Sequence, residues 1–99
     1  MRLVLIGCGF LGSLFAEEVA KLFFAFEERL AFVFIDDDQI DDRNPANHLY
    51  TPHDTGKEKA GALEDRMSLY GFQAESFPRR LERDSPLSLK LMDADLVVD

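Results

Sequence analysis

A glycine pattern, GCGFLG at residues 7–12, constrains the fold of this chain more than any other feature. It follows the apolar run 2–6 (RLVLI), typical of a strand buried in a parallel sheet, and it precedes a segment with the periodicity of an amphipathic helix. In that setting Gly7 permits a tight turn, Gly9 lets a phosphate approach the backbone, and Gly12 allows close packing of helix and strand. The start of the helix offers free N–H groups and a positive dipole end, so an anion site is predicted without any basic side chain. The alternative is that the glycines serve only the turn.

The rest of the chain alternates between strand-like and helix-like segments. Apolar runs at 31–35 and 96–98 predict two more buried strands, and residues 73–77 predict a further one. The first helix is expected from Leu11 to about Glu28, with this apolar stripe: Leu11, Phe15, Val19, Leu22 and Phe26. A second helix is expected to start at a capping box formed by Thr55 and Glu58 and to end at Gly71; a short helix over 87–92 is one interpretation of a mixed segment.

This alternation predicts a Rossmann-like, three-layer α/β/α fold. We expect a mostly parallel sheet of about four strands in the order 3-2-1-4, with right-handed crossovers. The chain stops one residue after its last strand, where a doubly wound sheet normally continues, so we interpret it as apparently truncated. We expect residues 1–99 to be one nucleotide-binding domain, the N-terminal part of a larger one.

Composition excludes several classes of partner. The formal net charge of −8 leaves no electrostatic basis for tracking nucleic acid. No apolar run is long enough to cross a membrane, and the single cysteine, Cys8, fits a reducing compartment, so we expect a cytoplasmic protein.

An acid stands where a nucleotide-binding fold of this type uses one. Asp36 follows the second predicted strand, 24 residues after Gly12, where a carboxylate accepts hydrogen bonds from ribose hydroxyls. A turn-forming role for Asp36 is the alternative. The loop and the acid together indicate an adenosine nucleotide without saying which one.

The segment after Asp36 is longer than the usual connection to the next helix, and it carries a second pattern. Residues 36–48 read DDDQIDDRNPANH and residues 49–60 read LYTPHDTGKEKA. This resembles the ThiF/MoeB family, which includes the ubiquitin-activating enzymes and has the pattern D-x-D-x-[VI]-x-x-x-N-L-x-R-Q followed by D-x-G-K-x-K-A. The resemblance implies ATP and Mg²⁺ as cofactors. It also implies that the complete enzyme adenylates the C-terminus of a ubiquitin-like or sulfur-carrier protein.

The resemblance assigns roles to matching positions. Gly7, Gly9 and Gly12 would face the phosphates, and Asp36 would hold the ribose. These further roles follow from it: Asp38 near the metal, Asn44 near the phosphates, and Lys59 bound to a phosphate. A homo-oligomer is also expected.

Two departures from the family pattern leave the activity open. Asn47 stands where the family has an arginine that stabilises the transferring phosphate, and Arg43 is the candidate replacement. The family's second acidic motif would begin at Asp99, so it lies beyond the last residue. The alternatives are a dinucleotide (NAD) module with a regulatory or redox role, and a catalytically degenerate scaffold.

Overall fold

The computed structural model describes residues 1–40, 54, 56–82 and 85–99. Its elements, in chain order, are β1 (Arg2–Ile6), α1 (Phe10–Ala25), β2 (Ala31–Ile35), α2 (Lys59–Leu69), β3 (Gln73–Phe77), η2 (Pro86–Ser88), α3 (Leu89–Met92) and β4 (Leu96–Val98). In the described part of the chain, none of the helices combines the length and the apolar composition that a membrane crossing requires.

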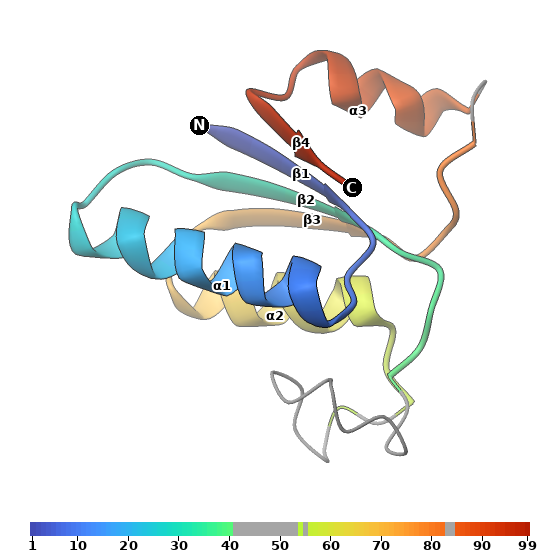
Figure 1. Ribbon diagram of the computed structural model, residues 1–99, viewed down its shortest axis with the longest axis horizontal. Coiled ribbons are helices and arrows are strands. Elements are labelled where there is room, and N and C mark those ends of the chain that lie inside the picture. Colours follow the sequence, from blue (N-terminus) through green and yellow to red (C-terminus); the bar gives the residue numbers. More distant parts are fainter. Residues whose placement is uncertain (41–53, 55, 83–84) are drawn as a thin grey trace.

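The four strands form one parallel sheet in the order β3-β2-β1-β4, which confirms the predicted fold class. Helices α1 and α2 lie on one face of this sheet and α3 lies on the other (Figure 1). Because every strand runs in the same direction, the segments that follow β1, β2 and β3 all leave the sheet at its carboxyl edge. Loops at this edge are where open α/β sheets bind ligands.

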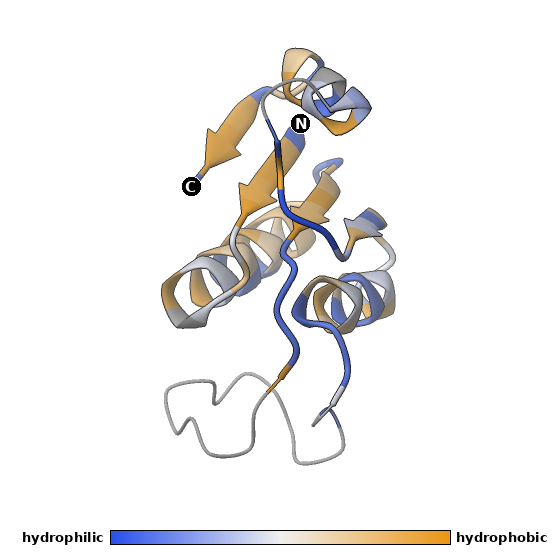
Figure 2. Ribbon diagram, turned by 90° about the vertical axis from the view of Figure 1, so that its right-hand side faces the viewer, coloured by the Kyte–Doolittle hydropathy of each residue, from blue (hydrophilic) through white to orange (hydrophobic). Residues whose placement is uncertain are grey.

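Strands β1 and β2 are buried on both faces, as their continuous apolar runs predict. Successive side chains of a strand point to opposite faces. Leu3, Leu5 and Phe34 belong to the core cluster under α1 and α2, whereas Val4 and Val33 belong to the cluster on the α3 side. Figure 2 shows the apolar strands at the centre and the hydrophilic segment that leaves β2 toward the outside.

The buried face of α1 differs from the predicted one. The helix buries Ser13, Ala16, Glu17 and Ala20, while most of the predicted apolar stripe is exposed, with Leu11 at 77%. The small residues let α1 approach the sheet closely, and Glu17 is buried because it has partners on α2. The periodicity therefore predicted the helix correctly and the side that packs on the sheet wrongly.

Strand β4 also differs from its prediction. It pairs only with β1, so in the described part of the chain it is an edge strand. Leu96 and Val97 are exposed rather than buried. The strand itself is confirmed.

The predicted capping box of α2 does not form as expected. Glu58 is the N-cap, and its side chain makes no capping hydrogen bond; Thr55 lies outside the described residues. Glu58 instead bridges Gln39 in antiparallel fashion, so the chain reaches the helix in an extended conformation. The predicted end is confirmed, because Gly71 has a positive φ of 87° and its N–H donates to the Ser68 carbonyl at 2.9 Å.

Candidate functional site

The glycine loop holds a sharp turn between β1 and α1. Gly7 has a φ of 90°, a conformation that favours glycine, and its N–H donates to the Ile35 carbonyl of β2 at 2.8 Å. Gly12 lies so close to this turn that an added Cβ would stand 2.6 Å from the Gly7 carbonyl oxygen. Two of the three glycines are thus required by the backbone itself.

Gly9 differs from the other two because the fold does not require it. It is the N-cap of α1, its φ of −73° suits any residue, and an added Cβ would meet nothing within 4 Å. The absence of a side chain there keeps the space over the loop open. A pocket of about 530 Å³ lies beside the loop, and its lining includes Gly7, Gly9, Leu11, Phe15 and Val98.

Asp36 ties the end of β2 to the glycine loop. One carboxylate oxygen accepts the backbone N–H of Cys8, and the other accepts that of Asp38 at 2.7 Å. These bonds fix the carboxylate beside the loop, at the carboxyl edge where the ribose role was predicted. Burial raises the pKa of the Cys8 thiol, and the charge of Asp36 raises it further while Lys59 opposes it. Cys8 is therefore a buried, neutral thiol at this site.

Lys59, the first residue of α2, reaches the same edge. Its backbone N–H donates to the Asp38 carbonyl at 3.0 Å, and its Nζ lies 3.5 Å from Asp38 Oδ2. Only 13% of the Lys59 side chain is exposed, against 54% for that of Lys57. Lys59 is thus no ordinary surface lysine: it is a mostly buried cation at the end of β2.

Three neighbouring carboxylates offer oxygen ligands at this point. One carboxylate oxygen each from Asp36, Asp37 and Asp38 lies within 4.8 Å of the others. Such hard ligands suit Mg²⁺. The other predicted site residues, Arg43 and Asn44, lie outside the described residues, as does Asn47.

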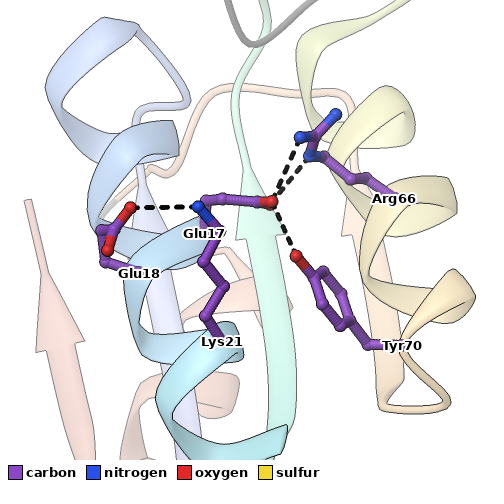
Figure 3. A network of polar contacts seen from close by, with 5 residues as sticks. All are labelled: Glu17, Glu18, Lys21, Arg66 and Tyr70. Carbon is purple, nitrogen blue, oxygen red and sulfur yellow. Dashed lines mark hydrogen bonds and ion pairs between the residues drawn. The ribbon is translucent and has the colours of Figure 1, made fainter. Parts of the chain in front are cut away.

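A polar network behind the site was missed by sequence reasoning. Glu17 of α1 accepts hydrogen bonds from Arg66 Nε at 2.7 Å, from an Arg66 terminal nitrogen at 3.1 Å and from the Tyr70 hydroxyl at 2.8 Å (Figure 3). Burial alone would raise the pKa of Glu17, but these hydrogen bonds lower it below the ordinary value of a glutamate. The hydrogen bond to Glu17 also raises the pKa of Arg66. No local pattern points to this network, because Arg66 and Tyr70 lie 49 and 53 residues from Glu17 in the sequence.

A larger cavity, of about 850 Å³, lies at the opposite end of the molecule. Its lining includes Met1, Phe23, Tyr70, Phe72 and Asp95, at the amino ends of the strands. None of the described predicted site residues lines it. This cavity is therefore separate from the pocket beside the glycine loop and lies at the opposite edge of the sheet.

The parallel sheet, the glycine turn and the acid after β2 define the class: a Rossmann-like fold with the features of a nucleotide site at its carboxyl edge. The ThiF family model matches residues 1–99, and the chain belongs to the ThiF family. No curated protein sequence matches the chain.

Solved structures share this fold. PaaA is 22% identical with a TM-score of 0.80, over 97% of this chain and 29% of PaaA. Escherichia coli MccB, solved with ATP, is 22% identical with a TM-score of 0.68, over 99% of this chain and 29% of MccB. The E. coli tRNA N6-threonylcarbamoyladenosine dehydratase TcdA, also solved with ATP, is 19% identical with a TM-score of 0.73, over 97% of this chain and 39% of TcdA. The chain thus spans well under half of each of these proteins.

Proposed function

We propose that this chain is the ATP-binding portion of an adenylate-forming enzyme. In the complete protein, the carboxylate of a peptide or protein C-terminus attacks the α-phosphorus of ATP, a new P–O bond forms, and pyrophosphate leaves. The observation that carries the proposal is the mostly buried Lys59, held at the carboxyl edge by Asp38, which in turn bonds to the Asp36 carboxylate beside the glycine loop. A dinucleotide site needs the loop and the acid but has no need of this lysine.

Different residues of the described part of the chain would bind the phosphates and the ribose of the nucleotide. The open backbone at Gly9 and the start of α1 would receive the phosphates, and Asp36 would accept a ribose hydroxyl. Lys59 would leave Asp38 to pair with a phosphate oxygen. Asn44 near the phosphates and Arg43 as the replacement for the family arginine remain part of the proposal.

Magnesium fits the donors at this edge. Asp38, two-thirds exposed, would hold the ion, with Asp36 and Asp37 offering further carboxylate oxygens. The ion would neutralise charge on the phosphoryl oxygens and on the departing pyrophosphate.

The partner class is the C-terminus of a ubiquitin-like or sulfur-carrier protein. MccB, which shares the fold of this chain, has been solved together with MccA. We also propose a homo-oligomer in the cytoplasm, and residues 1–99 as the N-terminal part of a larger domain.

Calorimetric titration with ATP, AMP and NAD in the presence of Mg²⁺ tests this function. ATP should bind, and Lys59→Ala should weaken ATP about ten- to hundredfold, since hydrogen bonds to charged groups contribute about 1.5–3 kcal/mol, while AMP loses less. Lys57→Ala is the matched control, because Lys57 is an exposed lysine two residues away. Binding of NAD without ATP would favour the dinucleotide module. Binding of neither nucleotide, together with a stable dimer, would favour a degenerate scaffold. Equal losses for the two lysine variants would remove the phosphate role of Lys59.

A further inference from the structure

Helices α1 and α2 each carry one part of the proposed phosphate site at their first turn. The glycine loop leads into α1, and Lys59 begins α2. The distance between these two parts therefore depends on how α2 is placed along α1 and the sheet. Whatever fixes that placement also fixes the cation relative to the loop.

The buried apolar side chains of these two helices are mostly small. The core side of α1 presents Ala16 and Ala20, and that of α2 presents Ala60 and Ala62 together with the larger Leu63. Small side chains make shallow ridges, and shallow ridges resist sliding less than interdigitated large ones. Met67, also buried on α2, is flexible enough to fill gaps in more than one arrangement.

The Glu17 clamp, formed by Glu17, Arg66 and Tyr70, adds directional polar contacts that fix the placement of α2 relative to α1. Glu17 is only 3% exposed and accepts three hydrogen bonds from α2 and its C-cap residue (Figure 3). The two-pronged contact with Arg66 sets angle as well as distance. The Glu17 carboxylate is buried, whereas 38% of the Arg66 side chain is exposed. Water therefore weakens the attraction while the carboxylate still loses its hydration, so a role in geometry explains the pair better than a role in stability.

The clamp and the start of α2 are two separate anchors of the same helix. At the front, the Lys59 N–H bonds to the Asp38 carbonyl at 3.0 Å. At the back, Arg66 lies seven residues further on, about 10 Å along the helix axis. Two anchors define the direction of the helix, which one anchor cannot do.

We propose that Glu17, Arg66 and Tyr70 are positioning residues that hold Lys59 at the separation from the glycine loop that a triphosphate requires. This inference rests on the proposed function of Lys59. The clamp touches no nucleotide itself; it acts through α2.

Two variants that weaken the clamp test this role by calorimetry with ATP and with AMP. Tyr70→Phe removes one hydrogen bond without changing charge. Glu17→Gln removes a negative charge, which by simple attraction would strengthen ATP binding, whereas loss of positioning weakens it. We expect ATP affinity to fall about five- to tenfold in both variants and AMP affinity to stay within about twofold. Glu18→Gln, which removes the neighbouring exposed acid, should not weaken ATP binding.

The same variants in a Lys59→Ala background test the positioning role of the clamp separately from the proposed phosphate role of Lys59. If the clamp acts through Lys59, it should cause no further loss of ATP affinity there. Thermal unfolding of each variant shows whether it is folded at the titration temperature. A lower melting temperature with an unchanged ratio of ATP to AMP affinity would make the clamp merely structural and overturn the inference. No effect of Lys59→Ala itself on ATP would overturn the proposed function, and the inference with it.

Discussion

Replacing Gly12 with alanine tests whether the close approach of α1 to β1 shapes the glycine loop. The new Cβ would stand 2.6 Å from the Gly7 carbonyl oxygen and 3.3 Å from Leu5 Cδ1. An ordinary contact between carbon and a carbonyl oxygen is about 3.3 Å, so backbone must move by about 0.7 Å. Overpacking of this kind costs about 1–3 kcal/mol, while alanine gains about 1 kcal/mol in helix propensity.

Gly61 provides a matched control for this change. It is the third residue of α2, as Gly12 is the third residue of α1, and an added Cβ there meets nothing within 4 Å. Gly61→Ala should therefore gain about 1 kcal/mol, and the propensity terms of the two variants cancel. The difference between their free energies of unfolding, about 1–3 kcal/mol, then measures the clash alone.

Urea unfolding and thermal melting of the two variants give this difference directly. For a domain of this size, 1 kcal/mol corresponds to about 4–8 °C, so Gly12→Ala should melt at least about 4 °C below Gly61→Ala. Gly12→Ala should also bind ATP more weakly, because the displaced Gly7 carbonyl belongs to the glycine loop, which is proposed to receive the phosphates. If Gly12→Ala proves as stable as Gly61→Ala, the close approach described for α1 is wrong.

Three further changes follow from single sites. Gly9→Ala should change the free energy of unfolding by less than about 1 kcal/mol, yet lower ATP affinity more than tenfold in calorimetry, because its Cβ meets only the space proposed for a phosphate; unchanged ATP affinity would place the phosphates elsewhere. Glu27 has a positive φ of 55°, so Glu27→Gly should raise stability by about 0.5–1 kcal/mol in urea unfolding, and a loss would contradict the turn described at the end of α1. Because the folded-state pKa of Glu17 is lowered, its contribution to stability is present at neutral pH and is lost as the pH falls below the ordinary range of a glutamate. Unfolding measured from pH 7 to pH 3 should show Glu17→Gln about 1–3 kcal/mol less stable than the parent at pH 7 and the gap closing toward pH 3; a gap independent of pH would contradict the charged clamp.

The strands were predictable to the residue because their signals are local. The apolar runs at 2–6 and 31–35 end abruptly at Gly7 and Asp36, and burial on both faces leaves no room for polar interruptions. The predicted strand order is likewise confirmed. It was predictable because the general preference for right-handed crossovers between parallel strands leaves few alternative orders.

The packing face of α1 was not predictable from periodicity. A stripe of large apolar residues is conspicuous in a helical pattern. Alanine and serine side chains have low hydrophobicity, so they add little to such a pattern. Here the small residues face the sheet, and the large stripe faces away from it. Burial of Glu17 depends on Arg66, 49 residues away in sequence, so no local pattern could reveal it.

The structure brings several of the predicted site residues together at the carboxyl edge of the sheet. Asp36 lies beside the glycine loop and Lys59 lies beside Asp38, because parallel strands bring their carboxyl ends together. The burial of the Lys59 side chain could not be predicted from the sequence. It depends on the bridge between Gln39 and Glu58 and on where α2 begins.

The most direct test of the central claim is to locate ATP on the chain by nuclear magnetic resonance. Amide signals of uniformly ¹⁵N-labelled protein would be followed as ATP and Mg²⁺ are added. We predict that the largest shifts fall on Gly9, Gly12 and Lys59 at the carboxyl edge. Shifts centred instead on the larger cavity at the amino edge, around Phe72 and Asp95, would contradict the account.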